Sequence, residues 1–286
     1  MTTSNKHGFF TDMSNEDYHA ANGISKSGLD KVEVSPLHFH KPKPFNQTRF
    51  MEIGTAIHAA ILEPARFKTD YNMTDAKDRR CKEYKEYCEG FTKETTMAAS
   101  EVGNILGMQK SVEADPEAQL YLRQPGQAEL SAFATDPETG IQIRARYDWI
   151  TEKLPMLNGG RVVVDVKKVQ DITAFGKSVN SYRYHVQEAM YRHVFQLIEG
   201  YELDAFYFLA VEENTPHACK MFTLSREALE VGRYYMRKNL NAYAAAVQSG
   251  HWPAPEVDSV IDLPQWAYNK HDALVEIDEA NQLWEL

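Results

Sequence analysis

The sequence has few cysteines and no long apolar run. Only three cysteines, Cys81, Cys88 and Cys219, occur in 286 residues, and no pair has CxxC spacing. This argues against a disulfide framework and against a four-thiolate zinc or iron–sulfur site, so we expect three reduced thiols. No apolar run approaches the roughly 20 residues that span a bilayer. The N-terminal MTTSNKHGFF lacks the apolar core of a signal peptide, and we therefore expect a cytoplasmic protein without a membrane anchor.

Positive charge is also scarce. The chain has 31 Lys and Arg against 41 Asp and Glu, a net charge of −10. This excludes a protein that coats nucleic acid through its overall charge, and any DNA contact must be local. The most basic stretch contains Lys26, Lys31, Lys41, Lys43 and Arg49, and it fits a solvated face as well as a DNA backbone contact. The hydrophobic content of 43% is enough for a substantial core.

The N-terminal part, residues 1–122, is predicted to be mainly helical after an opening of short polar turns. The segment FMEIGTAIHAAILEP has helical spacing and ends at Pro64, which places His58 on a helix. Residues 73–122 are rich in Lys, Glu, Ala and Met and predict two or three helices, broken near Gly90 and Asp115-Pro116.

Residues 123–250 are predicted to form an α/β core. The alternating runs AELSAFATD and IQIRARYDWI flank PETG and predict a β-hairpin, and the valines of RVVVDVKKV predict a central strand buried on both faces. A helix over 184–199 ends at Gly200, and two further strands precede a long helix over 225–248. We expect a mixed central sheet flanked by helices in one domain of residues 1–286. Residues 251–286 would form a C-terminal extension with a solvated acidic end from Asp272.

The predicted central strand carries two charged residues on one face. Asp165 and Lys167 are separated by one residue, so their side chains leave the same side of the strand. A plain ion pair at a strand end would explain the pair alone. However, Asp148 ends the preceding strand, and if the strands are neighbours, two carboxylates and a lysine converge. That set suits phosphodiester hydrolysis assisted by Mg²⁺ or Mn²⁺, with the lysine orienting or deprotonating the attacking water.

Five further polar residues have roles that the sequence leaves open. Gln187 and Tyr191 lie four residues apart on the helix after the central strand and share a face. Arg144 and Arg146 alternate on the second hairpin strand and fit a pairing with phosphate or with acids such as Glu129. Glu129 itself fits a solvated glutamate at a strand end better than an additional acid near a metal.

Four segments together resemble a known family. GTAIHAAILEP, RARYDWI, VVDVKK and YRYHVQEAMYRHVF resemble the PD-(D/E)XK nucleases, within them the RecB-like group, and most closely the RecE-like (exonuclease VIII) nucleases. The resemblance extends over roughly residues 8–268 and implies a restriction-endonuclease-like core with N-terminal helical additions. It also implies that His58, Asp148 and Asp165 are metal ligands, together with the backbone carbonyl of Val166, for two ions per site.

The same resemblance implies the remaining roles. Lys167 would be the catalytic lysine, and Gln187 and Tyr191 would support the site or touch DNA. The implied activity is processive 5′ to 3′ degradation of linear double-stranded DNA in a bacterial or phage-infected cell. It would leave 3′ single strands for a strand-annealing partner, and the enzyme would be a ring-shaped trimer or tetramer.

Some alternatives stay open, and the sequence departs from the family at two places. The alternatives are a related nuclease of other polarity or endonucleolytic habit, a non-catalytic DNA-binding protein on the same fold, and a hydrolase of another phosphoester. Lys168 stands where a small hydroxyl residue is usual, and the loop LPMLNGG lengthens the path between the two aspartates.

Overall fold

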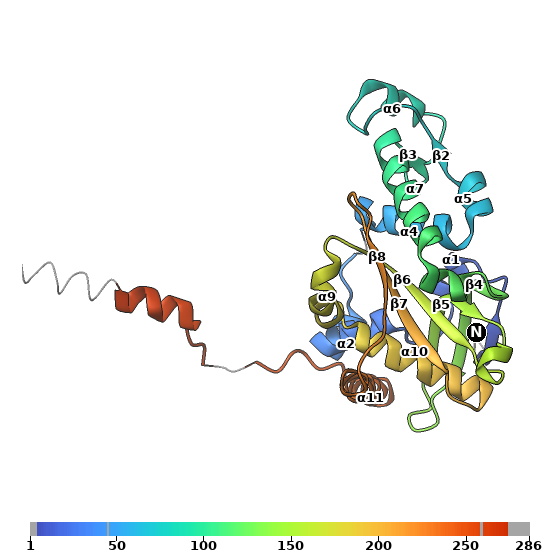
Figure 1. Ribbon diagram of the computed structural model, residues 1–286. Coiled ribbons are helices and arrows are strands. Elements are labelled where there is room, and N and C mark those ends of the chain that lie inside the picture. Colours follow the sequence, from blue (N-terminus) through green and yellow to red (C-terminus); the bar gives the residue numbers. More distant parts are fainter. Residues whose placement is uncertain (1–4, 45, 258–259, 274–286) are drawn as a thin grey trace, which may run out of the picture. The chain divides into compact units, whose positions relative to one another are not determined.

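A six-stranded mixed sheet runs through the computed structural model, which describes residues 5–44, 46–257 and 260–273 (Figure 1). Side by side, the strands are β1 (Gly8–Phe10), β4 (Gly126–Thr135), β5 (Gln142–Thr151), β6 (Val162–Val169), β7 (Ala205–Glu212) and β8 (Cys219–Phe222). Within this sheet, as far as the described residues go, β6 and β7 pair in parallel and the other neighbours are antiparallel. The predicted hairpin and the central strand are therefore confirmed.

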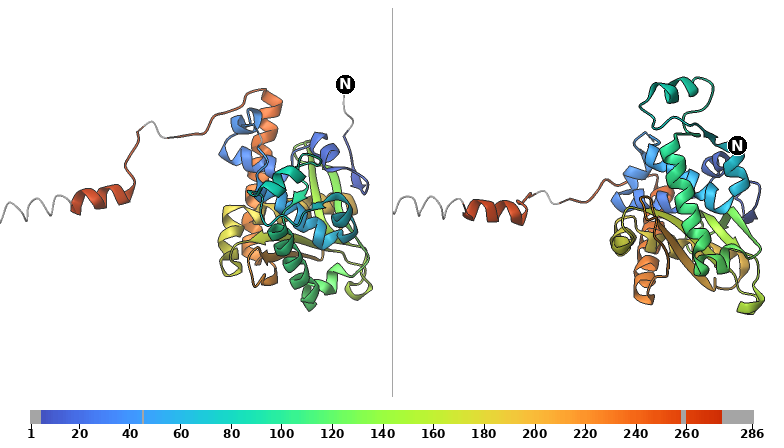
Figure 2. Two further views of the ribbon diagram at one scale, coloured as in Figure 1. Left: turned by 90° about the horizontal axis from the view of Figure 1, so that it is seen from above. Right: turned by 45° about the horizontal axis from the view of Figure 1, so that its top comes forward.

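Helices cover both faces of this sheet (Figures 1 and 2). One face packs against α2 (Lys26–Val34), α9 (Phe175–Ser181), α10 (Tyr184–Glu199) and α11 (Arg226–Ser249). The other face packs against α4 (Arg49–Leu62), α5 (Pro64–Asp70), α7 (Ala99–Ala114) and α8 (Pro116–Leu122). The fold is thus the expected α/β sheet between helical layers, with a core on either side.

Alternation along β6 decides which face carries the chemistry. Val162, Val164 and Val166 are fully buried in the core beneath α4 and α7, whereas Val163 belongs to the core beneath α10. Because successive side chains of a strand point to opposite faces, Asp165 lies on the α10 side. Residue 168 falls on the α4 side for the same reason.

The first 50 residues differ from the predicted polar turns, because they contain the helices α1 (Asn15–Ala20), α2 and α3 (Pro36–His40). Local capping explains α1 and α3. The Ser14 hydroxyl accepts a hydrogen bond from the Asp17 N–H, the Ser35 hydroxyl accepts one from His38 N–H, and Pro36 occupies the first turn. Tyr18 anchors α1 in the core, with 5% of its surface exposed.

A small subassembly projects from the body at the top of Figure 1. It holds α6 (Lys82–Tyr87) and the two-residue strands β2 (Asn72–Met73) and β3 (Thr96–Met97), around a satellite core that includes Tyr84. The expected helix breaks near Gly90 and Asp115-Pro116 are present, but the β2–β3 pair escaped prediction because two residues are too few for a periodic pattern.

The chain divides into a body of residues 1–253 and a second unit of residues 254–286. Within the second unit, residues 265–273 are helical, and most of the acidic end expected to be solvated lies outside the described residues. All three cysteines are free thiols. Among the described residues, no helix is both long and apolar enough to span a membrane.

Candidate metal centre

The pairing between β5 and β6 is short, and Asp148 lies where it ends. The two strands pair only at Trp149–Val164 and Ile150–Val163. Beyond that point, Asp148 Oδ2 accepts a hydrogen bond from the backbone N–H of Val166 at 2.8 Å. Asp148 therefore stands beside the Asp165–Lys167 segment, as expected. It lies within β5, which continues to Thr151, and the prediction that it ends the strand was wrong in this detail.

Asp165 is held by two partners on the α10 side of the sheet. Its side chain is 1% exposed and forms an ion pair with the ammonium of Lys167. The Gln187 side-chain amide, from α10, donates to Asp165 Oδ1 at 2.6 Å. The Lys167 ammonium also lies 4.8 Å from the centre of the Tyr184 ring. Strand alternation and the helix that follows thus bring Asp165, Lys167 and Gln187 together, as the sequence predicted.

His58 reaches the same region from α4, which packs on the opposite face of the sheet from α10. Its Nδ1 atom lies 3.5 Å from Asp148 Oδ2 and 3.9 Å from Glu129 Oε1. One ligand atom from each of these three residues lies within 4.8 Å of the others. A cavity of about 390 Å³ is lined by all three residues and by Tyr191.

Glu129 is the site residue that sequence reasoning missed. The hairpin register contained a usable signal, because Ala128 pairs with Trp149 and Leu130 pairs with Tyr147, which sets Glu129 opposite Asp148. The prediction of a solvated glutamate was wrong. Its side chain is only 26% exposed and contacts His58 and Arg146.

Burial and crowded charges shift the protonation of this cluster. Burial by itself lowers the pKa of His58, but the Asp148 and Glu129 carboxylates outweigh it and raise that pKa to about 9. Burial, with help from the Asp165 charge, raises the pKa of Asp148 to about 7. Burial opposes ionisation of Glu129, yet His58 and Arg146 lower its pKa to about 2. The cluster consequently holds protons at neutral pH that a cation would have to displace.

Lys167 remains charged in this environment. Burial lowers the pKa of its ammonium, but the Asp165 and Asp148 carboxylates outweigh that effect and raise it above the ordinary value. A protonated lysine can donate hydrogen bonds and stabilise negative charge, but it cannot accept a proton.

The other two expected residues have different surroundings. Tyr191 packs edge-on against Tyr147, and its carbonyl accepts the Tyr147 hydroxyl at 2.9 Å. Its ring therefore forms a rigid wall of the cavity. The Val166 side chain is buried in the core beneath α4, so only its backbone is available to the site.

Several charged residues are already paired within the protein. Arg144 donates to the carbonyls of Tyr18 and Ala21, and it clamps the end of α1 instead of facing phosphate. The sequence offered Arg146 either a phosphate or an acid as its partner, and in the structure it pairs with Glu129. Lys168, the departure from the family pattern, faces Glu213 at 3.0 Å on the α4 side. Its side chain therefore lies on the opposite face of the sheet from Asp165.

The basic N-terminal stretch is partly neutralised as well. Lys26 pairs with Asp30 at 2.7 Å, and Arg49 pairs with both Glu52 and Glu101. The charges of these two side chains are therefore already paired with acids of the protein itself.

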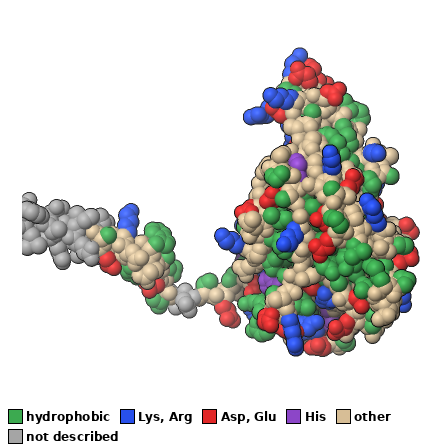
Figure 3. Space-filling view, in the orientation of Figure 1, with side chains coloured by type: hydrophobic (Ala, Val, Ile, Leu, Met, Phe, Trp, Pro, Cys, Tyr) green, Lys and Arg blue, Asp and Glu red, His purple; other side chains and the backbone are tan. Residues whose placement is uncertain are grey.

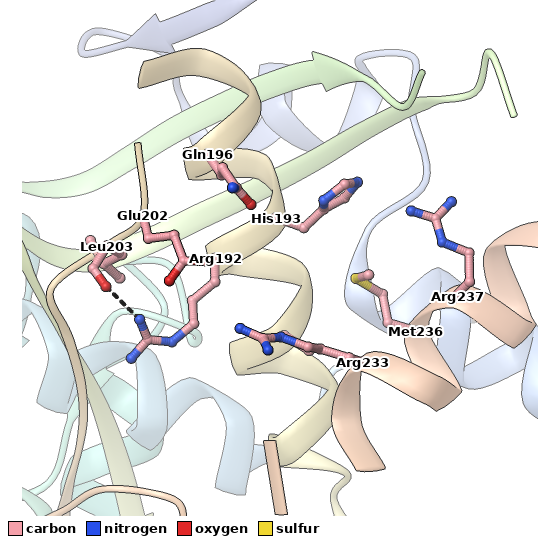
Figure 4. A pocket seen from close by; sticks show the side chains of 9 residues that line it. Arg192, His193, Gln196, Glu202, Leu203, Arg233, Met236 and Arg237 are labelled. Carbon is pink, nitrogen blue, oxygen red and sulfur yellow. Dashed lines mark hydrogen bonds between the residues drawn. The ribbon is translucent and has the colours of Figure 1, made fainter. Parts of the chain in front are cut away.

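A second cavity, of about 270 Å³, lies between α10 and α11 (Figure 4). It is lined by three arginines, but each has an internal partner: Arg192 pairs with Glu188, Arg233 with Glu230, and Arg237 with Asp136. Because these charges are already neutralised, the cavity is a weaker candidate for an anion or a metal than the His58 cluster.

The donor chemistry of the His58 cluster fits a divalent cation. Two carboxylates and one imidazole are suitable ligands for Mn²⁺ or Mg²⁺, and donors that share an ion at about 2.1 Å lie roughly 3 to 4 Å apart. The distances from His58 Nδ1 to Asp148 and Glu129, 3.5 and 3.9 Å, fall in that range. Asp165 supplies a further buried carboxylate. It precedes Val166, whose backbone N–H donates to Asp148.

A family match and one solved structure agree with this fold. A family described as a PDDEXK-like domain of unknown function (DUF3799) matches residues 34–260. A crystal structure from Eubacterium rectale, of a protein provisionally described as an exonuclease, superposes with a TM-score of 0.61. The two chains are 14% identical, with 89% of this chain and 95% of the other covered. The structure of SSO0001 aligns over 78% of this chain and 86% of its own at 13% identity, with a TM-score of 0.29. No curated protein matches the chain.

Proposed function

We propose a function from the premise that this chain belongs to the PDDEXK-like family DUF3799. The proposed activity is metal-dependent hydrolysis of DNA phosphodiesters at the His58–Asp148–Asp165–Lys167 site. As a finer proposal, the enzyme is a processive 5′ to 3′ exonuclease on linear double-stranded DNA that leaves 3′ single strands for an annealing partner.

One observation carries the proposal most strongly. The Asp148 carboxylate bonds to the N–H of Val166, the residue between Asp165 and Lys167, and lies 3.5 Å from His58. Thus α4 and β5 each supply a donor to one cavity, and β6 is bonded to that cavity's Asp148 through its backbone. A DNA-binding module without activity has no use for carboxylates that repel phosphate, so this convergence favours catalysis over binding alone.

His58, Asp148, Asp165 and the Val166 carbonyl are the groups proposed to hold one or two Mg²⁺ or Mn²⁺ ions. Bound there, such ions would neutralise charge on the scissile phosphate and acidify a nearby water. The chain itself supplies position. Gln187 fixes the Asp165 carboxylate at 2.6 Å, and the packed Tyr191 ring limits the volume in which the phosphate can lie.

Lys167 is proposed to act as a charged donor. Its raised pKa keeps the ammonium protonated near neutral pH, which suits orienting the attacking water and stabilising charge on the phosphate. The raised pKa supports this role over the general-base role that the sequence also left open. A general-base role would need a lowered pKa.

The overall charge supports enclosure of DNA as the mode of retention. Lys and Arg side chains are interspersed with Asp and Glu on the face shown in Figure 3, and the net charge is −10. Such a surface attracts a polyanion weakly. A ring-shaped trimer or tetramer would hold DNA topologically, and its mass is measurable by sedimentation or light scattering.

The direct test uses linear duplex labelled at either the 5′ or the 3′ end, with Mg²⁺, with Mn²⁺ and with chelator. We expect metal-dependent release of labelled nucleotides from the 5′ end first. Asp165→Ala and Lys167→Ala should lose activity by about 100-fold or more. Lys220→Ala, which removes an exposed lysine on β8, is the matched control and should retain it.

Three results would reject parts of this function. If wild type releases nothing with either metal, or if both site variants stay active, the hydrolytic mechanism is wrong. Early release of the 3′ label, or cutting of closed circular DNA, would replace the proposed polarity or the exonuclease habit. A monomer at working concentration would remove the ring.

A further inference from the structure

Glu129 has an unusual backbone for its position. It lies within β4, yet its φ angle is +51°, in the left-handed region that glycine adopts readily and a glutamate rarely does. The β4–β5 ladder records Ala128–Trp149 and Leu130–Tyr147 but no pairing at the position between them. The hairpin is therefore interrupted at Glu129 and Asp148.

The interruption changes where side chains point. Leu130 and Tyr147 belong to the core beneath α10, whereas Trp149 packs into the core beneath α4. In an unbroken strand, Tyr147 and Trp149 would share a face. The local reversal lets both carboxylates of the interrupted pair reach the cavity that His58 lines.

The Glu129 carboxylate is also oriented. Its Oε2 atom accepts from Arg146 Nε at 2.7 Å, and its Oε1 atom faces His58 Nδ1 at 3.9 Å. The Arg146 guanidinium is itself held, because it donates to Ser131 Oγ at 2.9 Å and to the Met13 carbonyl at 3.1 Å. One oxygen is therefore committed to the protein and the other is turned toward the cluster.

We propose that Glu129 is a direct ligand of a divalent cation that is also held by His58 and Asp148, with Arg146 orienting its carboxylate. The inference rests on the proposed function and adds a ligand to it. One ligand atom each of Glu129, Asp148 and His58 lies within 4.8 Å of the others. The Glu129 carboxylate also matters for charge, because within the His58 cluster Asp148 supplies one negative charge to a divalent ion and Glu129 supplies a second.

A structural role is the competing explanation. In that case Glu129 would serve only to neutralise Arg146, and its charge would not affect a bound ion. Glu129→Gln separates the two roles, because the amide oxygen can still accept from Arg146 while the cavity loses a charged ligand. Glu63→Gln is the matched control, since Glu63 lines the same cavity but pairs with Arg66.

The test is metal binding by the full chain in the absence of DNA. Mn²⁺ affinity is measured by titration calorimetry, and the visible absorption of bound Co²⁺ reports a change of ligand set. We expect Glu129→Gln to weaken Mn²⁺ binding by at least about 10-fold, the lower end of what loss of a supporting group costs a metal site. It should also alter the Co²⁺ spectrum, while Glu63→Gln changes neither. Thermal melting with chelator checks that both variants are folded.

The outcomes separate this inference from the function on which it rests. If Glu129→Gln is folded and binds Mn²⁺ with wild-type affinity and an unchanged Co²⁺ spectrum, Glu129 is not a ligand, even though the nuclease activity could stand. If wild type cleaves DNA only with metal and Glu129→Gln loses Mn²⁺ affinity, the inference holds. If wild type binds no Mn²⁺ at all, both this inference and the proposed function fail.

Discussion

The Asp148 carboxylate accepts a hydrogen bond from the backbone N–H of Val166 at 2.8 Å, across the point where β5 and β6 stop pairing. A single side chain thus replaces a ladder hydrogen bond and faces His58 at 3.5 Å. Structure and chemistry depend on different properties of this group. The hydrogen bond needs an acceptor oxygen, whereas the metal needs a negative charge.

Two substitutions of Asp148 should separate these properties. Asp148→Asn keeps an acceptor for Val166 and removes a charge that burial disfavours, as the pKa of about 7 indicates. We expect its melting temperature in chelator to equal or exceed that of wild type, while nuclease activity falls about 100-fold or more. Asp148→Ala leaves the Val166 N–H without its partner, at a cost of about 1–3 kcal/mol. If Asp148→Asn melts below Asp148→Ala, this assignment of roles is wrong.

Gln187 should matter through Asp165. Gln187→Ala removes the donor to a carboxylate whose side chain is 1% exposed, so we expect lower activity and a loss of about 1–3 kcal/mol in the free energy of unfolding. Urea denaturation and the end-labelled duplex assay measure the two effects. Gln196→Ala, at an exposed position of the same helix, should change neither. Equal behaviour of the two variants would contradict a positioning role for Gln187.

Metal affinity should rise with pH. In the metal-free protein the pKa of His58 is about 9, so below that pH a cation must displace its proton. We expect the apparent Mn²⁺ affinity to increase between pH 6 and 8 by up to about tenfold per pH unit for each proton displaced. The rise should be steeper below pH 7, where Asp148 also has to lose a proton. Calorimetry in buffers of different ionisation enthalpy counts those protons. His58→Gln should bind more weakly and release fewer, and an affinity that is independent of pH would exclude His58 as a ligand.

Asp136, just after β4, should dominate the acid sensitivity of the body. It is fully buried and accepts from both terminal nitrogens of Arg237 at 3.0 Å and from His193 at 2.8 Å. Burial raises its pKa, but Arg237, Thr139 and His193 outweigh burial and lower it. A lowered pKa stabilises the fold above the unfolded value of about 3.9, and that contribution is lost as pH falls below it.

Substitution tests this network at neutral pH. Asp136→Asn leaves Arg237 without its buried partner and should cost about 3–5 kcal/mol in the free energy of unfolding. Glu138→Gln, which removes a 66% exposed partner of the same arginine, should cost less than about 1 kcal/mol. Urea midpoints at pH 7 and at about pH 3, below the unfolded pKa of about 3.9, give both values. The gap between wild type and Asp136→Asn should narrow at the lower pH, and a gap that widens would reverse the assigned sign.

Local patterns were sufficient for most of the secondary structure. The predicted helices around His58 and Gln187, the hairpin and the central strand are all present, because each has an apolar period that is complete within about ten residues. The shared face of Asp165 and Lys167 followed from the same reasoning, since side chains alternate along any strand. The short helices α1 and α3 were missed because their cues are single caps.

Long-range packing decided the rest of the site. Nothing near His58 in the chain indicates that α4 brings it within 3.5 Å of Asp148, and the family resemblance alone suggested it. Arg144 shows the same limit, because its partners are carbonyls at the end of α1, which only the folded chain brings beside β5. The role of Glu129 was missed because its left-handed backbone breaks the alternation on which strand prediction depends.

Alternation and helical periodicity therefore specified which side chains share a face, because each segment gains free energy by burying its own apolar face. The meeting of α4, β4 and β5 around one cavity, with β6 bonded to Asp148 beside it, was specified only by tertiary packing. Its partners lie tens of residues apart, and the free energy that joins them comes from the two cores on either side of the sheet.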